Sequence, residues 1–357
     1  MIYINGRFLT QKITGVARFA FELCKVFQEM DVEYTLLIPK NQKIEIENNF
    51  TCLSIGKYQS HLWEQVDLPK YLKSVGKPLL INFSGLGPLF YDNQIITIHD
   101  LSFYVEPKWF SFSYRLFYGC LTPIVAKKSK AIITVSNFSK SEIQKFLKVP
   151  SEKITVVYNS ISQNLKNNHD SIQATSDTAK KYILAVSSLD PRKNHQKLIE
   201  AFESDLFDNY YLYLVGKGAS HFNINLKENN NERLKFLGYV SDNELMELYS
   251  GAEVFIYPSL YEGFGVPPLE AMINKCPIIV SNIAPLREVC QDAAYYIDPN
   301  DVRSIINGLN EVINNTELRI RLSKSGFARA NEFSWTTSGT KVIELIKKIS
   351  HESSSND

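Results

Sequence analysis

The sequence predicts an α/β protein of two domains, each built on a parallel β-sheet that is covered by helices. Short apolar runs alternate with longer segments of helical periodicity along most of the chain. A polar stretch at residues 161–181 interrupts this alternation, which then starts again. The chain has 357 residues, more than one domain of ordinary size. Repeated strand–helix–strand units form parallel sheets that bind ligands at the carboxyl ends of their strands.

Composition narrows the classes of function. The formal net charge is +1, whereas nucleic acid binding needs a basic excess, so we expect no nucleic acid partner. The five cysteines are scattered without a Cys-x-x-Cys pair, so we expect neither disulfides nor a zinc site, as suits a reducing cytoplasm. The first residues read as a strand rather than a secretion signal, and no apolar run reaches the length of a membrane span. We therefore expect a cytoplasmic protein.

The first half contains two candidate ligand contacts. Strands are expected at residues 1–9, 33–39, 77–83, 94–98, 131–135 and 154–157, and helices at 17–28, 63–73, 111–128 and 139–148. Gly15 lies in the loop 10–16, after the first strand, where such sheets bind ligands, although an ordinary turn glycine fits as well. His99 and Asp100 end the strand at 94–98 and should point to the ligand side, where histidine can hydrogen-bond a substrate. The alternative is a structural loop histidine held by its neighbour.

Residues 111–130 are expected to form an amphipathic helix with an unusual composition. The segment is aromatic at Phe112, Tyr114, Phe117 and Tyr118, and it is basic at its end. A helix of this kind can lie on a membrane surface. The alternative is a helix that packs inward and leaves a solvated basic end, so peripheral membrane contact remains one of two interpretations.

The second half repeats the strand–helix alternation. Strands are expected at 182–186, 210–215, 234–237, 252–257, 277–281 and 294–297, and helices at 196–203, 244–250, 268–274, 302–314, 317–331 and 336–349. Arg192 and Lys193 follow the first of these strands, beside a helix start, where both can bond to a diphosphate. A solvated basic turn is the alternative. The run Gly216-Lys217-Gly218 is only a weak dinucleotide fingerprint, because the third glycine is absent.

The stretch from Ser259 to Met272 has the most specific pattern. Gly263 and Gly265 form a turn after an apolar strand, and carboxylates at Glu262 and Glu270 bracket them. Glycines let the backbone approach a ligand, and the start of the following helix offers N–H groups and a dipole to an anion. Carboxylates on either side can accept hydrogen bonds from hydroxyls. The pattern suits a sugar nucleotide, although Glu270 could also merely complement the helix dipole.

With these residues in place, the chain resembles the retaining glycosyltransferases of family 4 over essentially its whole length. These enzymes have the GT-B fold, in which two Rossmann-like domains face each other across a cleft. Glu262 and Glu270 match the family's E-x7-E motif. Supporting segments occur in the expected order, namely His99-Asp100, Val135-Ser136-Asn137-Phe138-Ser139, Tyr158-Asn159-Ser160, Pro191-Arg192-Lys193-Asn194 and residues 238–245.

The resemblance implies a domain plan. Residues 1–162 would form the acceptor-binding domain, 163–181 a linker and 182–332 the nucleotide-sugar domain. The helix within 333–357 would pack back on the first domain, ahead of a frayed tail.

The resemblance also implies roles for single residues. Glu270 would hold the ribose hydroxyls, and Glu262 would lie near the donor sugar. His99 would face the reacting sugar and the acceptor. The remaining donor contacts would be Arg192 and Lys193 at the diphosphate, the backbone of Gly263, Phe264, Gly265 and Val266 at the phosphates and sugar, Tyr239 and Val240 at the base, and Gly15 at the diphosphate.

Breaking the sugar–diphosphate bond builds negative charge on the leaving group, which the enzyme must stabilise. The chain contains no Asp-x-Asp, the metal-holding motif of the GT-A class, so Arg192, Lys193 and a helix start would take this role without a divalent metal or another cofactor. The acceptor would attack the sugar from the same face from which the leaving group departs. Many members carry Gly-Arg where this chain has Ser187-Ser188, which removes one cation.

The pattern leaves the substrates open. GDP-mannose, a UDP-hexose and dTDP-rhamnose all suit the motifs as donors. Bacterial relatives commonly build lipid-linked O-antigen or capsule repeat units, so the resemblance implies a saccharide acceptor, lipid-linked, at the inner face of the cytoplasmic membrane. Three alternatives stay open: a sugar-nucleotide epimerase, which shares the GT-B fold, a dinucleotide-dependent oxidoreductase, and a non-catalytic sugar-binding protein.

Overall fold

The computed structural model describes residues 2–11, 14–40, 42–45, 49–162, 181–216 and 231–354. The chain forms two compact units. The first comprises Met1–Asn159 together with Ser334–Asp357, and the second comprises Ser160–Phe333. The expected linker at 163–181 lies outside the described residues except for Lys181, as do Lys217 and Gly218 of the weak dinucleotide motif.

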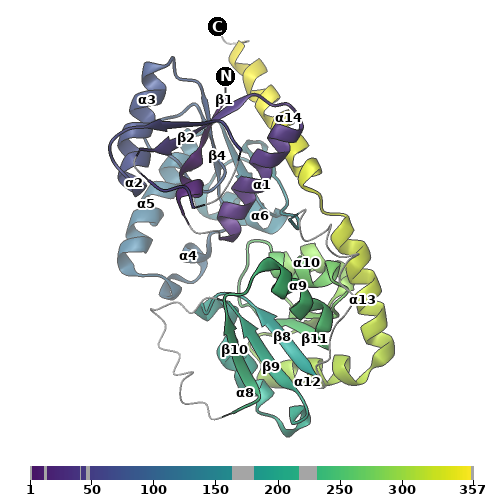
Figure 1. Ribbon diagram of the computed structural model, residues 1–357. Helices are drawn as coiled ribbons and strands as arrows, with labels where there is room; N and C mark the ends of the chain where they lie inside the picture. Colours follow the sequence, from purple (N-terminus) through teal and green to yellow (C-terminus); the bar gives the residue numbers. More distant parts are fainter. Residues whose placement is uncertain are drawn as a thin grey trace. The chain divides into compact units, whose positions relative to one another are not determined.

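A parallel sheet of seven strands forms the centre of the first unit, in the order β3-β2-β1-β4-β5-β6-β7 (Figure 1). The strands are β1 (Ile2–Asn5), β2 (Tyr34–Pro39), β3 (Cys52–Ile55), β4 (Leu79–Asn82), β5 (Gln94–Thr97), β6 (Ala131–Thr134) and β7 (Ile154–Val156). Because β4 adds beside β1 on the side away from β2, loops leaving β1 and β4 diverge and open a ligand site at their carboxyl ends.

Two expectations near the sheet were wrong. The first strand ends at Asn5, and Gly6–Thr10 forms a 3-10 helix because the Asn5 side chain accepts a hydrogen bond from the Arg7 N–H. Strand β3 was not predicted, because two of its four residues are exposed at the edge of the sheet and the run lacks a clear apolar alternation.

The helices of the first unit include one from the end of the chain. They are α1 (Gly15–Glu29), α2 (Ser60–Leu62), α3 (Leu68–Ser74), α4 (Ser102–Val105), α5 (Phe112–Lys128), α6 (Asn137–Leu147) and α14 (Trp335–Ser354), with a π-helix at Trp63–Asp67. Helix α14 packs along α1 (Figure 1). The Trp335 and Phe19 rings meet edge-on at 5.8 Å. A Cβ on Gly339 would lie 2.4 Å from Val26, so the close approach of the two helices requires glycine there.

Helix α5 differs from the expected amphipathic helix. Its buried residues are Thr122, Val125 and Ala126, all near its C-terminal end. Phe112, Leu116 and Phe117 in its N-terminal half are exposed. The helix is therefore divided along its axis into a packed half and an exposed aromatic half, not into two faces. Among the described residues, no helix is both long enough and apolar enough to cross a membrane.

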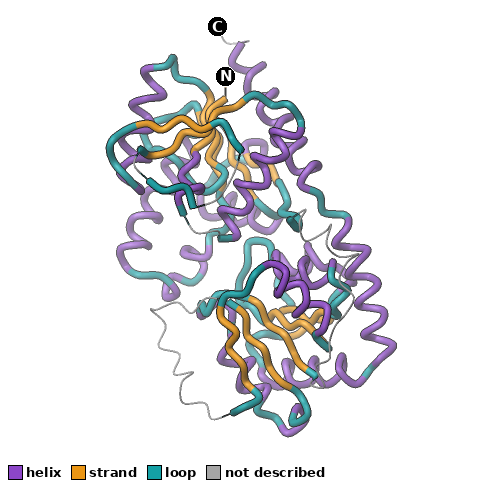
Figure 2. Tube along the Cα trace, viewed as in Figure 1, coloured by secondary structure: helices purple, strands orange, loops and turns teal. Residues whose placement is uncertain are grey.

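The second unit has a six-stranded parallel sheet in the order β10-β9-β8-β11-β12-β13, the doubly wound order of Rossmann folds. The strands are β8 (Tyr182–Val186), β9 (Tyr211–Val215), β10 (Leu234–Gly238), β11 (Val254–Tyr257), β12 (Ile278–Ser281) and β13 (Tyr295–Ile297). The helices are α8 (His195–Phe202), α9 (Asp242–Gly251), α10 (Val266–Ile273), α11 (Ala284–Cys290), α12 (Val302–Asn314) and α13 (Thr316–Asn331). Figure 2 shows the strands of each unit lying side by side with helices around them.

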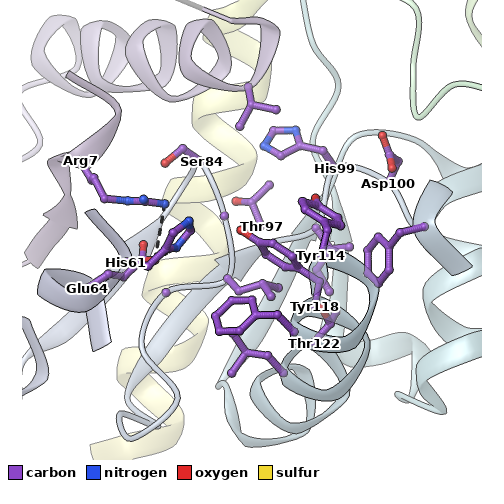
Figure 3. Close-up of a pocket in the computed structure, with 18 of the residues that line it drawn as sticks. Arg7, His61, Glu64, Ser84, Thr97, His99, Asp100, Tyr114, Tyr118 and Thr122 are labelled. Atoms are coloured by element: carbon purple, nitrogen blue, oxygen red, sulfur yellow. Dashed lines mark ion pairs between the residues drawn. The ribbon is translucent and has the colours of Figure 1, made fainter. Parts of the chain in front are cut away.

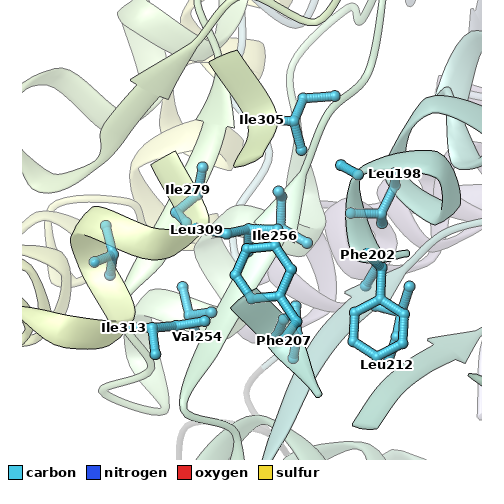
Figure 4. Packing of buried hydrophobic residues seen from close by; sticks show 14 of the residues in the cluster. Leu198, Phe202, Phe207, Leu212, Val254, Ile256, Ile279, Ile305, Leu309 and Ile313 are labelled. Carbon is cyan, nitrogen blue, oxygen red and sulfur yellow. The ribbon is translucent and has the colours of Figure 1, made fainter. Parts of the chain in front are cut away.

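One apolar cluster holds the second sheet to its helices. Leu198 and Phe202 of α8, Ile256 of β11 and Leu309 of α12 pack together beneath the sheet (Figure 4). Burying a side chain of this size stabilises a fold by about 1.5–3 kcal/mol. The cluster fixes the positions of β8 and β11, whose carboxyl ends carry the motifs found in the sequence.

Candidate functional site

The motifs of the second unit meet at the ends of two adjacent strands. Strand β8 pairs with β11, and the strand order reverses its direction between them. Ligands bind at such switch points, because the loops that leave the two strands diverge there. The backbone N–H of Leu260 donates to the carbonyl of Arg192 at 2.7 Å. The Asn194 amide donates to the Pro258 carbonyl at 3.1 Å. The loops after β8 and β11 are thus bonded together.

The glycine turn has a strict steric requirement. Gly265 has φ +104°, and a Cβ there would lie 2.6 Å from Leu286. The residue caps α10, which begins at Val266 and not at Pro268 as expected. Of the four N–H positions that lack partners at a helix start, two are occupied by Pro267 and Pro268, which have no N–H. The helix start therefore offers an anion only the N–H groups of Gly265 and Val266, fewer than the sequence suggested.

The neighbouring residues Gly263 and Phe264 are buried. The Phe264 ring meets Phe333 edge-on at 5.7 Å, so this side chain is a packing residue and only its backbone is available to a ligand.

Lys193 and Glu262 form a tight ion pair. The Lys193 Nζ lies 2.5 Å from the Glu262 Oε1 and also donates to the Tyr257 hydroxyl at 2.8 Å. Burial alone would lower the pKa of Lys193, but Glu262 and Tyr257 outweigh it and raise the pKa above its usual value. The ammonium therefore stays charged at all physiological pH values.

Arg192 is held by a carboxylate of its own loop. Its Nε and Nη2 donate to the Asp190 Oδ2 at 3.1 and 3.0 Å. Asp190 also caps the 3-10 helix at Pro191–Lys193, so the ion pair stiffens this turn. Both cations that were expected to face a diphosphate thus already have a carboxylate partner.

Glu270 lies one turn into α10 and is separate from this ion pair. Its Oε2 accepts a hydrogen bond from the Tyr249 hydroxyl at 3.1 Å. The two glutamates of the motif therefore have different partners. Tyr239, expected near the base, follows β10 and is 74% exposed, and Val240 next to it is half-buried.

The first unit has a pocket of about 220 Å³ at the carboxyl ends of β1, β4 and β5. Arg7, His61 and Glu64 lie together on one side of it, and His99, Asp100 and Tyr114 lie on the other (Figure 3). Aromatic rings of α4 and α5 form part of the wall, namely Phe103, Tyr114, Phe117 and Tyr118. Aromatic faces beside charged hydrogen-bonding groups are suited to sugar rings, which present C–H faces and hydroxyl edges.

His99 is a neutral ring at the edge of this pocket. Its Nε2 lies 3.0 Å from the Phe83 carbonyl, which can only accept, so Nε2 carries the proton. Burial lowers the pKa of His99, so the ring is neutral at pH 7 and Nδ1 is a hydrogen-bond acceptor. The Asp100 Oδ1 accepts from the Ser102 N–H and hydroxyl at 2.9 and 2.6 Å, and the charge of Asp100 partly offsets the lowering of the His99 pKa by burial.

A buried polar chain beneath the pocket was missed in the sequence. The Asn5 amide donates to Glu64 at 2.8 Å and to Asn82 at 3.0 Å, and Arg7 lies 3.5 Å from Glu64. Burial alone would raise the pKa of Glu64, but His61, Arg7 and Asn5 outweigh it and lower the pKa. The carboxylate is therefore ionised. The one available signal was that Asn5 and Asn82 each end a buried strand.

Gly15 is the first residue of α1, and not part of a loop as expected. The Thr14 hydroxyl caps this helix by accepting from the Ala17 N–H at 3.2 Å. A Cβ on Gly15 would meet no atom within 4 Å, so packing within the described residues does not explain the glycine. Its place at a helix start is compatible with an anionic ligand.

Comparison with known proteins assigns the class. The family model "Glycosyl transferases group 1" matches residues 166–329, and "Glycosyltransferase Family 4" matches residues 13–165. The fold is similar to that of sucrose-phosphate synthase from Thermosynechococcus elongatus, with a TM-score of 0.77 and 16% identity over 98% of this chain and 99% of that one. It is also similar to WaaG, a glycosyltransferase of lipopolysaccharide biosynthesis, with a TM-score of 0.73 and 15% identity over 97% and 99%. The fold and motifs define a GT-B glycosyltransferase.

Curated relatives narrow the family. The chain is 30% identical to the O-antigen chain mannosyltransferase B of Escherichia coli over 280 residues, 74% of each chain. It is 36% identical to the O-antigen chain mannosyltransferase RfbU of Salmonella typhimurium over 217 residues, 59% of this chain and 58% of that one. The chain belongs to the family 4 glycosyltransferases, and it is a glycosyltransferase. Membership of this family favours glycosyl transfer over epimerisation and over sugar binding without catalysis.

Proposed function

We propose that this enzyme transfers a mannosyl unit from a nucleotide diphosphate sugar to a saccharide acceptor, with retention of configuration and without a metal requirement. The observation that carries the proposal is the arrangement of the Lys193–Glu262 ion pair and of Glu270 before and after the glycine turn at the switch point of the second unit. The mannosyltransferase relatives support mannose over other hexoses. Cell-surface polysaccharide synthesis, of O-antigen or capsule, is the corresponding pathway class.

Each part of the donor has a matching group. The Glu270 carboxylate accepts hydrogen bonds from the ribose hydroxyls, and the base lies near Tyr239 and Val240. The N–H groups of Gly265 and Val266 hold the diphosphate. As the sugar–oxygen bond breaks, the Lys193 ammonium neutralises the charge that develops on the leaving group. Charges that are already in place act strongly, because they need no reorganisation during the reaction.

The acceptor binds in the pocket of the first unit. Its sugar ring stacks on the aromatic wall formed by Tyr114 and Tyr118, and its hydroxyls bond to Arg7 and Glu64. The Nδ1 of the neutral His99 accepts a hydrogen bond from a hydroxyl close to the reacting carbon. An acceptor hydroxyl attacks the sugar carbon from the same face from which the diphosphate departs. The configuration at that carbon is therefore retained.

A direct test combines a donor screen with one variant. GDP-mannose, UDP-glucose, UDP-galactose and dTDP-rhamnose are each incubated with the enzyme and a mannosylated acceptor, in buffer with EDTA. We expect transfer from GDP-mannose, and an α-linked product by NMR. Glu270→Gln keeps the shape but weakens ribose binding, and should lower kcat/KM at least 100-fold, by analogy with loss of other charged contacts. Transfer that needs added metal, inverts the anomer or survives Glu270→Gln contradicts the proposal.

We propose further that the acceptor is lipid-linked and that residues 111–130 contact the cytoplasmic face of the membrane. Phe112 is 71% exposed and Leu116 is 58% exposed, although both are large apolar side chains. Lys127 and Lys128 lie exposed at the other end of the same helix. Exposed apolar side chains and lysines on one helix suit an anionic lipid surface.

Liposome sedimentation tests this contact. Vesicles with 30% anionic lipid should retain the enzyme, and the double change Phe112→Ser with Leu116→Ser should lower binding about 10-fold, because apolar burial drives insertion. Ile320→Ser, at an exposed apolar residue of the second unit, is the matched control. Equal binding by all three proteins, together with full activity on soluble acceptors, contradicts the contact.

A further inference from the structure

Two buried tyrosines each contact one glutamate of the E-x7-E motif. Tyr257 is the last residue of β11, and Tyr249 lies in α9. Tyr257 is 3% exposed and Tyr249 is 1% exposed. Neither was singled out in the sequence, where each is one of many apolar-segment residues. Their hydroxyl groups nevertheless end at the two carboxylates on which the proposed donor site depends.

Tyr257 closes a triangle with Lys193 and Glu262. The Lys193 Nζ donates to the Tyr257 oxygen at 2.8 Å, and Nζ also lies 2.5 Å from Glu262. Burial raises the pKa of Tyr257, and so do the charge of Glu262 and the hydrogen bond to it. The phenol therefore keeps its proton and donates a hydrogen bond to the Glu262 carboxylate. Each of the three groups holds the other two.

The triangle fixes the direction of the ammonium group. An ammonium has three N–H donors, and two of them point to Tyr257 and Glu262. With two directions set, the third N–H has one remaining direction. Without the tyrosine oxygen, the ammonium would keep only the Glu262 contact and could rotate about it. Its third N–H would then be less well aligned with a leaving group.

Tyr249 makes a simpler contact with Glu270. Its hydroxyl donates to the Glu270 Oε2 at 3.1 Å, and the phenol ring packs edge-on against Phe255 at 5.5 Å. Burial raises the pKa of Tyr249 well above its usual value, and Glu270 adds to this rise. The tyrosine is thus a permanent donor on a rigid ring. Such a bond sets the plane in which the carboxylate presents its oxygens.

We propose that these two tyrosines are positioning residues with different roles. Tyr257 aligns Lys193 and Glu262 for the bond-breaking step. Tyr249 orients Glu270 for donor binding. The proposal rests on the donor site of the proposed function. It predicts that removal of one hydroxyl affects kcat and that removal of the other affects KM. A purely structural role predicts the same effect for both.

The test uses Tyr257→Phe and Tyr249→Phe in the full-length enzyme, with kcat and the donor KM measured at saturating acceptor. We expect Tyr257→Phe to lower kcat about 10-fold with an unchanged donor KM. We expect Tyr249→Phe to raise the donor KM about 10-fold with an unchanged kcat. Calorimetric titration with GDP gives a second reading of binding, and only Tyr249→Phe should weaken it.

Tyr182→Phe is the matched control. Tyr182 is also buried, and its hydroxyl donates to the Leu248 carbonyl at 2.8 Å. It begins β8, however, at the end of the sheet away from the site. The Tyr182→Phe variant should lose about as much thermal stability as the other two variants and should keep the wild-type kinetic constants.

The outcomes separate the two proposals. If the wild type transfers sugar and Glu270→Gln does not, the donor site stands. The proposed difference between the two tyrosines is then wrong if both tyrosine variants keep the wild-type kinetic constants. It is also wrong if both variants change kcat and KM together as the fold weakens. If Glu270→Gln remains fully active, the donor site itself is wrong.

Discussion

The two sheets share one strand order at their centres but carry different chemistry at their carboxyl ends. In the second unit, the loops after β8 and β11 bring together two cations and two carboxylates within hydrogen-bond distance. In the first unit, the loops after β1, β4 and β5 line a pocket that also has aromatic rings of α4 and α5 in its wall and the Arg7–Glu64 ion pair at its edge. Topology thus determines where a ligand binds, and the loop residues determine which ligand it is.

Each unit also contains one neutral histidine near its switch point. His99 follows β5 and lines the pocket, whereas His195 begins α8 and is 3% exposed. His195 Nε2 lies 2.8 Å from the Ser187 hydroxyl. Burial lowers the pKa of both rings, and that of His195 to about 4. The same chemical group therefore contacts the pocket in one unit and supports the backbone in the other.

The largest expected effect concerns His195 and acid stability. Its pKa falls from 6.5 in the unfolded chain to about 4 in the folded one, so between these pH values the unfolded chain binds more protons. The free energy of unfolding should therefore fall by about 3 kcal/mol as the pH is lowered through this window. Urea unfolding at pH 4 to 7 measures it. His195→Gln should flatten the profile, and an unchanged slope would show that His195 is not buried as a neutral ring.

The next effect is specific to the first unit. His99→Ala removes the acceptor atom Nδ1 from the pocket and should lower kcat by about 10-fold, as expected for the loss of one hydrogen bond to the substrate. The donor KM serves as the internal control, because His99 lies outside the second unit. A raised donor KM with an unchanged kcat would mean that the two units do not divide the substrates as proposed.

The smallest effect compares one helical glycine from each unit. A Cβ on Gly119 of α5 would meet nothing within 4 Å, whereas one on Gly308 of α12 would lie 2.5 Å from Ile297. Gly119→Ala should raise the free energy of unfolding by up to about 1 kcal/mol, because alanine favours helix. Gly308→Ala should lower it by a similar amount or more through overpacking. Thermal melts of both variants show whether the second unit is the more tightly packed.

The two sites also differ in how far the sequence predicts them. Glu262, Glu270 and the glycines lie within one short stretch, so their common site is readable from their spacing. Asn5 and Glu64 are 59 positions apart and meet only in the folded chain, where the π-helix at Trp63–Asp67 reaches the end of β1. The partners of the charged residues, Asp190, Tyr249 and Tyr257, were not foreseen either, because side-chain rotamers determine them. The alternation of apolar runs and helical segments was enough to predict the other strands of both sheets. It did not predict the short edge strand β3, because two of its four residues are exposed.

Pairing of charges has a consequence for how the donor arrives. Arg192 with Asp190 and Lys193 with Glu262 carry no net charge as a group. From beyond about 10 Å, a diphosphate therefore experiences little attraction to this site, and salt has little attraction to screen. The donor should associate at an ordinary diffusional rate that depends weakly on ionic strength. In the proposed site, its selection would then occur at contact, where hydrogen bonds to the turn and the glutamates distinguish a sugar nucleotide from another anion.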